Sequence, residues 1–255
     1  MSDNNKYVIS LYDYTGEALK PWAEAGYKCI AYDIQHSKNP VTIDYTSNGE
    51  IFGSGGSITY CKADLHDKET LDHLLTVYRR KNVVFGMAFP VCTDLAVSGA
   101  SHFKRKAKAN PKFQWEATRH AVRCSYLFEH LEIPYFIENP VSVLSTLWRK
   151  PNHSFHPWHY GGYIPEAEAE HPKWADYIAP RDAYPKKTCL WTGGNFRMPI
   201  KLPVKPEAGH SRQHLKLGGK SMKTKNIRSA TPRGFAKAVW QANDPVIWRY
   251  SNLVA

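Results

Sequence analysis

Short apolar stretches alternate with amphipathic ones through the first 140 residues of the chain. Residues 7–12 (YVISLY), 28–33 (KCIAYD) and 82–87 (NVVFGM) have the apolar character of buried strands. Between them, residues 17–25 and 68–79 space their apolar side chains as amphipathic helices do. This alternation is typical of βαβ units, so it predicts an α/β fold around a parallel sheet.

The pattern continues beyond these elements. Residues 51–61 (IFGSGGSITYC) contain the Gly and Ser of a hairpin or a tight connection. After the strand at 82–87 we expect a long polar loop to about residue 112. A helix over 113–130 and a strand over 134–137 (PYFI) should follow this loop.

The C-terminal part has a weaker pattern. Residues 149–185 are rich in Pro, His, Trp and Tyr, and they show little periodicity, as do residues 195–227. Residues 231–243 predict a closing helix, with Thr231 as its N-cap and Pro232 at the first helical position.

Composition excludes several classes of protein. With 255 residues, of which 42% are hydrophobic and 13% aromatic, the chain can bury a core and is not disordered. We see no secretory signal, and the longest apolar run, 83–92, is about half of the ~20 residues that a membrane helix needs. We therefore expect a soluble, intracellular protein without a membrane partner. The five cysteines include no CxxC pair, which argues against a disulfide framework and a zinc ribbon.

The net charge of +11 is concentrated in two segments. Residues 101–123 contain seven Lys and Arg against one acid, and residues 201–235 contain nine against one. Such local basicity indicates a polyanionic partner, most commonly nucleic acid. The alternative is a pair of solvated basic loops without a partner.

Acidic side chains follow several of the predicted strands. Asp13 follows the first strand, where Gly16 permits a tight turn, Asp33 follows the second, and Asp64 follows the segment that ends in YCKAD. In open α/β sheets ligands bind at the carboxyl ends of strands, where Asp33 is placed to bind a ribose hydroxyl and Asp64 to reach an adenine or ribose. Each acid alone is more commonly a cap or turn residue, but three in register favour a ligand site.

A thiol and a carboxylate follow two further strands. Cys92 comes after the strand at 82–87, and Glu138 comes after the strand at 134–137. A lone cysteine at a strand end is usually inert packing. Because these two strands are successive, however, both side chains should face one cleft.

Five segments in chain order resemble the cytosine-5 DNA methyltransferase family. SLYDYTGEALKPWAEAGYKCIAYD resembles its first cofactor segment, FPVCTDLAVSGA its nucleophile segment and IENP its ENV-type segment. DAYPKKTCLW and RSATPRGFAKAVWQAN resemble later segments of the short phage-type branch. Two features depart from the family. Tyr14 and Glu17 stand at glycine positions of the first segment, and Val91 replaces the proline before Cys92.

The resemblance implies a Rossmann-like S-adenosylmethionine-dependent methyltransferase fold with a small irregular C-terminal recognition region. Residues 1–148 would form the core, 149–227 the target-recognition region, and 228–255 a C-terminal helix that packs back on the core. The cofactor, S-adenosylmethionine, would be bound by residues near the strand ends: Tyr12, Gly16, Asp33, Asp64 and Pro90.

The resemblance also implies the chemistry. The Cys92 thiolate would add to carbon 6 of a flipped cytosine, while Glu138 would bind or protonate ring nitrogen 3. Carbon 5 then takes the methyl group, loses its proton, and Cys92 is eliminated. Asn139 would fix the geometry of Glu138, and Lys187 or a nearby basic residue would replace the family's base-contacting arginine.

The basic segments would then bind DNA, most simply a duplex. The segment that follows Cys92 would close over the phosphates around the flipped base, and a second group lies near the C-terminus. These residues are Lys104, Arg105, Lys106 and Lys108, together with Lys220, Lys223, Lys225 and Arg228. The resemblance places such a protein, phage-encoded, in the cytoplasm of a bacterial host.

Other interpretations remain open from the residues. The chain could be a degenerate methyltransferase fold that binds DNA without catalysis, or an enzyme that modifies free cytosine nucleotides. Only 40 residues separate Lys187 from Arg228, which favours weak or very short sequence specificity. The three histidines of HSFHPWH lack metal-ligand spacing on one helical face, so we prefer stacking on bases or a small core to a zinc site.

Overall fold

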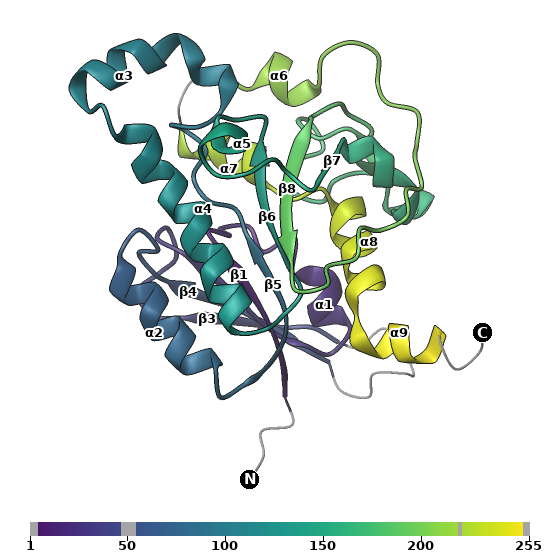
Figure 1. The fold of residues 1–255 in the computed structure, drawn as a ribbon. Helices are drawn as coiled ribbons and strands as arrows, with labels where there is room; N and C mark the ends of the chain where they lie inside the picture. Colours follow the sequence, from purple (N-terminus) through teal and green to yellow (C-terminus); the bar gives the residue numbers. More distant parts are fainter. Residues whose placement is uncertain (1–4, 47–54, 219–220, 252–255) are drawn as a thin grey trace.

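One mixed sheet organises the molecule (Figure 1). The computed structural model describes residues 5–46, 55–218 and 221–251. Within them the strands lie in the order β3-β4-β2-β1-β5-β6-β8-β7. The strands are β1 (Lys6–Leu11), β2 (Lys28–Asp33), β3 (Val41–Asp44), β4 (Ser57–Lys62), β5 (Asn82–Ala88), β6 (Tyr135–Pro140), β7 (His153–Phe155) and β8 (Thr188–Gly193).

The five central strands are parallel. From β1 the strands β2 and β4 are added on one side of the sheet, and β5 and β6 are then added on the other side. β1 pairs in parallel with both β2 and β5, and the parallel ladder extends to β4 on one side and to β6 on the other. β3, β8 and β7 are added at the edges by antiparallel pairing. In a doubly wound sheet the reversal between β1 and β5 opens a crevice at the carboxyl ends of these strands. The expected α/β, Rossmann-like class is confirmed.

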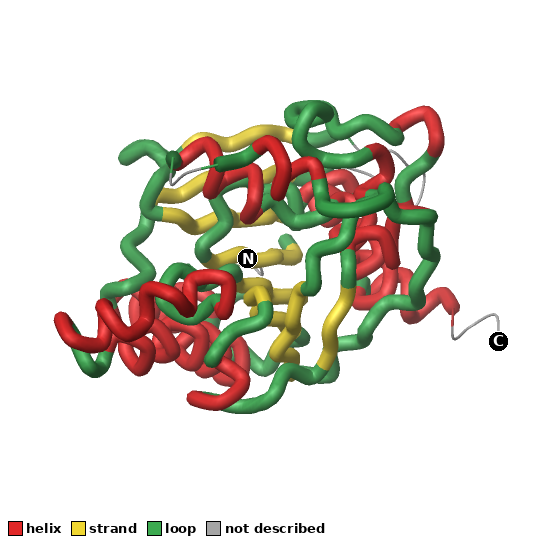
Figure 2. The backbone as a smooth tube through the Cα atoms, turned by 90° about the horizontal axis from the view of Figure 1, so that it is seen from above, coloured by secondary structure: helices red, strands yellow, loops and turns green. Residues whose placement is uncertain are grey.

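Alternate side chains of β1 point to two separate cores. Ile9 and Leu11 pack with α2 (Lys68–Tyr78) and α4 (Phe113–His130) on one face of the sheet. Val8 packs with α1 (Lys20–Glu24) and α8 (Arg233–Asn243) on the other face. Figure 2 shows the sheet from above with helices on both sides. No helix in the described part of the chain is long and apolar enough to cross a bilayer.

The strands at β1, β2, β5 and β6 and the helices at α2 and α4 confirm the sequence-based expectations to within a few residues. The prediction of a long loop up to residue 112 was wrong. This segment contains the 3-10 helix Val97–His102 and α3 (Phe103–Ala109), since FKRKAKA is rich in good helix formers but has no apolar stripe. The hairpin expected at 51–61 falls partly outside the described residues, and its second half is β4, paired with β3.

The region 149–227 is less irregular than its composition suggests. Its strands β7 and β8 join the main sheet, and it also contains α6 (Arg212–Lys216) and most of α7 (Met222–Ser229). The remaining described elements are α5 (Leu144–Leu147), α9 (Pro245–Ser251) and three 3-10 helices, Pro157–Tyr163, Glu166–Glu168 and Pro180–Asp182.

The start of α8 differs from the expected one. The helix begins at Arg233, so Pro232 is the N-cap, and no side chain of the preceding residues caps it. Instead, Oδ2 of the distant Asp182 accepts a hydrogen bond from the Gly234 N–H at 2.9 Å. The Thr231 cap was wrong because a carboxylate 52 positions away in the chain satisfies the helix terminus, which local sequence does not reveal.

Candidate functional site

Backbone pairing brings the Cys92 loop against the end of β6. The Val97 N–H donates to the Val141 carbonyl at 3.1 Å, and the Val143 N–H donates to the Leu95 carbonyl at 3.0 Å. The Cys92 carbonyl itself accepts hydrogen bonds from two N–H groups farther along the same loop. Since Glu138 lies in β6 just before this contact, the thiol and the carboxyl group are held at one edge of the sheet.

Asn139 fixes the other side of this loop. Its Nδ2 donates to the Pro90 carbonyl at 3.0 Å, and the side chain is only 1% exposed. A buried hydrogen bond from β6 to the residue two positions before Cys92 restricts where the thiol can lie. Asn139 therefore positions the Cys92 loop, in addition to standing next to Glu138.

The pKa shifts show that three ionisable groups act on one another. Burial raises the pKa of Cys92, the negative charge of Glu138 raises it further, and the Lys186 ammonium opposes both. Burial also raises the pKa of Glu138, again opposed by Lys186. The Lys186 Nζ is held by the Arg228 carbonyl, to which it donates at 2.8 Å. One cation thus favours the charged forms of both the thiol and the carboxyl group.

Two neighbouring lysines, Lys186 and Lys187, precede the first residue of β8. Burial lowers the pKa of His156 and raises that of Cys189, and the Lys187 charge lowers both. The Lys186 charge lowers the pKa values of Cys92 and Glu138. Lys186 is therefore the basic residue near Lys187 that contributes to the pKa values of these two groups.

A small cavity of about 10 Å³ lies beside Glu138, which is room for about one water molecule. Its walls come from the ends of β5 and β6, from the start of β8 and from the segment that leads into α8. A ligand larger than a water molecule can enter this cavity only if one of these walls moves. The lining residues are Phe89, Glu138, Phe155, Lys186, Thr188, Ser229, Ala230, Thr231, Pro232 and Phe235.

Tyr12, Asp33, Asp64 and Pro90 lie at or just after the ends of the adjacent strands β1, β2, β4 and β5. The Tyr12 hydroxyl donates to the Leu65 carbonyl at 2.8 Å. Burial raises the pKa of Tyr12, and the charges of Asp64 and Asp33 are among those that add to this rise. Each of these two carboxylates accepts a backbone hydrogen bond in its own turn: Asp33 Oδ1 from the Gln35 N–H at 2.8 Å, and Asp64 Oδ1 from the His66 N–H at 3.0 Å.

The turn after β1 keeps its shape with one glycine. Gly16 has φ +67°, and its N–H donates to Asp13 Oδ1 at 2.8 Å. Ser10 donates to the other carboxylate oxygen of Asp13 at 2.8 Å. A Cβ at Gly16 would lie 2.5 Å from the Tyr60 hydroxyl, so the space beside Gly16 is filled by a side chain. The buried Asp13 carboxylate therefore stabilises this turn by accepting hydrogen bonds from both of its sides. The position of Asp13 after the strand did not reveal this role.

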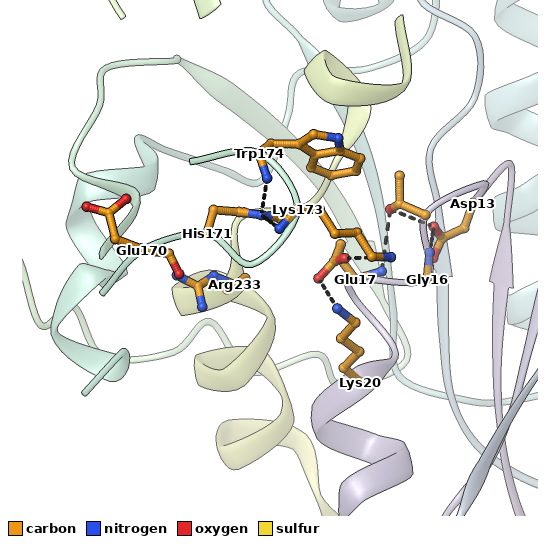
Figure 3. Close-up of polar contacts among 10 residues, drawn as sticks. Asp13, Gly16, Glu17, Lys20, Glu170, His171, Lys173, Trp174 and Arg233 are labelled. Atoms are coloured by element: carbon orange, nitrogen blue, oxygen red, sulfur yellow. Dashed lines mark hydrogen bonds and ion pairs between the residues drawn. The ribbon is translucent and has the colours of Figure 1, made fainter. Parts of the chain in front are cut away.

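Glu17, at a family glycine position, has a fully buried side chain that points toward two lysines (Figure 3). Its Oε2 lies 2.7 Å from Lys20 Nζ, and its Oε1 lies 3.7 Å from Lys173 Nζ. The carboxylate that stands in place of a glycine is therefore compensated by two cations, one of them from the region after β7.

The basic residues of the two predicted groups lie on helices α3 and α7, toward the end of the molecule where β5 and β6 terminate (Figure 1). Lys104, Arg105 and Lys108 are exposed, as are Lys223, Lys225 and Arg228. Lys106 differs, because its Nζ pairs with Asp94 and donates to the Thr93 carbonyl at 3.4 Å. Lys220 lies outside the described residues.

Comparison with known proteins gives limited similarity. No family model matches the sequence, and no curated protein matches it. A crystal structure from Escherichia coli, described as that of a proposed DNA modification methyltransferase encoded within a prophage, aligns over 97% of this chain and 69% of its own. The TM-score is 0.38 and the sequence identity is 12%. At this level the functional conclusion depends on the residues and geometry of the site.

Proposed function

We propose that this chain is a DNA cytosine-5 methyltransferase in which Cys92 is the nucleophile and Glu138 the acid. The observation that carries this proposal is the placement of the three groups: the Cys92 loop pairs with the chain just after β6, and Glu138 of β6 and Lys186 before β8 line one cavity. A thiol beside a buried carboxyl group and a lysine suits addition to an electron-poor ring whose nitrogen must take a proton. The resemblance of the surrounding segments to the cytosine-5 family supports the same chemistry.

The raised pKa of Glu138 favours the protonated carboxyl group, which can donate its proton to ring nitrogen 3 of cytosine. A neutral Glu138 no longer repels the negative charge on Cys92, so protonation of the first group assists ionisation of the second. The Lys186 charge favours the ionised form of either group. Adding the Cys92 sulfur to carbon 6 then makes carbon 5 nucleophilic, and loss of the carbon 5 proton later expels the sulfur.

S-adenosylmethionine would supply the methyl group, and Tyr12, Asp33, Asp64 and Pro90 would hold it at the ends of β1, β2, β4 and β5. Asn139 keeps the Cys92 loop against β6 through the Pro90 carbonyl. The exposed lysines and arginines of α3 and α7 would bind phosphates on either side of the base. We assign target recognition to the region 149–227 and core functions to residues 1–148.

The test is transfer of a tritiated methyl group from S-adenosylmethionine to unmodified duplex DNA, followed by identification of the labelled nucleoside. The expected label is in 5-methylcytosine, and it should be absent with Cys92→Ala and strongly reduced with Glu138→Gln. Cys61→Ser is the matched control, because Cys61 is a half-buried thiol on β4, which β2 and β1 separate from β5 in the sheet. Salt-sensitive DNA binding without any transfer to duplex, single strand or nucleotide would instead indicate a non-catalytic DNA-binding protein.

A further inference from the structure

A second cavity, of about 360 Å³, opens beside the turn after β1 and is separate from the Cys92 site. It lies between that turn, the segment after β2, the edge strand β3 with its neighbour β4, and two residues of the 149–227 region. The cavity adjoins the proposed cofactor site, because Thr15 precedes Gly16 and the Gln35 N–H donates to Asp33 Oδ1 at 2.8 Å, but neither Gly16 nor Asp33 lines it. The lining residues are Tyr14, Thr15, Gln35, His36, Ser37, Val41, Ile43, Tyr60, Lys173 and Trp174.

Flat rings dominate the walls. The Tyr14 ring is stacked on His36 with centroids 5.6 Å apart and an angle of 18°, and it is 40% exposed. His36 in turn meets the Tyr60 ring edge-on at 5.2 Å. Trp174 adds an indole from the other part of the chain. Aromatic faces of this kind bind nucleobases by stacking, whichever base is present.

The charge of the cavity is positive. Lys173 lines it, and no Asp or Glu of the described residues does. Glu17 Oε1 lies 3.7 Å from the Lys173 Nζ, beyond hydrogen-bond distance, so the ammonium still has protons to donate to a ligand. Glu17 Oε1 is itself buried without a hydrogen-bond partner among the described residues. Thr15, Gln35 and Ser37 add neutral polar groups.

A buried histidine holds the lysine and the tryptophan in place. His171 Nδ1 accepts hydrogen bonds from the backbone N–H groups of Lys173 and Trp174, both at 3.2 Å (Figure 3). His171 is 3% exposed, so a buried side chain holds the backbone of this turn. The two side chains that would contact a ligand therefore start from a rigid backbone, which lowers the entropic cost of binding.

We infer that this cavity binds a nucleotide, with the base against the Tyr14 and Trp174 rings and the phosphate on Lys173. The volume is within the range of small-ligand pockets. The nucleotide is either free or one unit of a single strand. This inference does not depend on methyl transfer, since a protein without catalysis would bind the same ligand.

The experiment is calorimetric titration of the intact chain with 2′-deoxyadenosine, its 5′-monophosphate and a four-nucleotide single strand. The monophosphate should bind more tightly than the nucleoside because of Lys173. Lys173→Gln should remove this difference, and Trp174→Ala should weaken all three ligands at least fivefold. Trp115→Ala is the matched control, since Trp115 is 56% exposed on α4 and outside the cavity.

Saturable binding of the monophosphate supports a free nucleotide, and binding of the strand alone supports a unit of a strand. Thermal melting shows whether each variant is folded. If Trp174→Ala does not fold, Lys173→Gln still tests the inference. Absence of binding by the wild type overturns the inference, as does binding that neither variant changes. Displacement of the nucleotide by S-adenosylmethionine in Trp115→Ala and wild type alike also overturns it, because the cavity would then belong to the cofactor.

Discussion

Lys186 and Lys187 are neighbours in sequence but influence different groups. Lys186 lowers the pKa of both Cys92 and Glu138 against the effect of burial, and it is anchored on the Arg228 carbonyl just before the C-terminal helix. Lys187 acts on His156 and Cys189 instead. Of the two lysines, Lys186 is therefore the one whose charge acts on both groups of the proposed site.

We predict that Lys186→Gln raises the pKa of Cys92 and slows both alkylation and methyl transfer. Without the lysine, burial and Glu138 act on the thiol unopposed by that cation. Alkylation by iodoacetamide at about pH 7.5 should slow by roughly two- to tenfold, because the thiolate is the reacting form. A Cys61→Ser background leaves Cys92 as the one cysteine that is not buried.

Lys187→Gln in the same background distinguishes the two lysines. It should leave the pH dependence of Cys92 alkylation the same as in the Cys61→Ser protein. A larger effect of Lys187→Gln than of Lys186→Gln would show that the residue expected from sequence is the one that serves the thiol.

Helix α3 connects a group of exposed basic residues to the Cys92 loop. Its Lys106 reaches back to that loop, where it pairs with Asp94 and donates to the Thr93 carbonyl, both immediately after Cys92. Lys104, Arg105 and Lys108 on the same helix are exposed. One helix thus offers charges to a polyanion and also restrains the segment that carries the thiol.

We predict that these two roles separate in DNA-binding measurements. Replacing Lys104, Arg105 and Lys108 with Gln should reduce the slope of log affinity against log salt concentration by about 0.9 for each phosphate that is no longer neutralised. Lys106→Gln should change the slope less, because Asp94 already compensates its charge, yet it should lower the methyl-transfer rate. Fluorescence anisotropy of a labelled duplex at several salt concentrations measures the slope. Equal slope changes for Lys104→Gln and Lys106→Gln would contradict the separation.

The elements with a strong apolar pattern were predictable, and those without one were not. β1, β2, β5 and α4 were expected almost at their observed bounds because each buries a face in a core. Helix α3 has no buried residue, and all four residues of β3 are exposed, so neither leaves a hydrophobic signal. Propensity alone favours α3, and β3 depends on its pairing with β4.

Some features of the candidate site could likewise be predicted from the sequence, and others could not. The positions of Cys92, Asp33 and Asp64 at or after strand ends follow from recognising the strands, whereas Glu138 lies within β6, which continues to Pro140. The role of Asn139 toward Pro90 depends on a contact across 49 positions in sequence. The Asp182 contact with α8 and the Glu17 pair with Lys173 likewise join distant segments, and only the folded chain reveals them.

At the scale of the whole molecule, three distant parts of the chain meet around His171. Burial lowers the pKa of His171 to about 4, Glu17 opposes this shift, and Arg233, Lys20 and Lys173 reinforce it. Arg233 also donates to three carbonyls of the preceding segment, at residues 168, 169 and 170. The turn after β1, the 149–227 region and α8 are therefore coupled through one neutral imidazole.

We predict that this arrangement makes the fold sensitive to mild acid. The pKa of His171 is below its unfolded value of 6.5, so its contribution to stability is fully present above about pH 6.5 and is lost as the pH falls toward 4. The melting temperature of His171→Asn should therefore fall less than that of the wild type between about pH 7 and about pH 5. His73→Asn, at an exposed position on α2, should follow the wild type. Parallel curves for the wild type and His171→Asn would refute the coupling.

The sheet order also constrains how the chain can be assembled as it is synthesised. In the described residues β7 pairs with β8 alone, and β8 lies between β7 and β6, although β7 is made first. β7 must therefore wait until the chain has grown past Thr188 before it has a strand to pair with. Phe155 in β7 stacks on Phe235 of α8 at 4.0 Å, which is made later still. A nascent chain that stops before α8 exposes the aromatic residues of this core, so release before completion should favour aggregation over a partly active product.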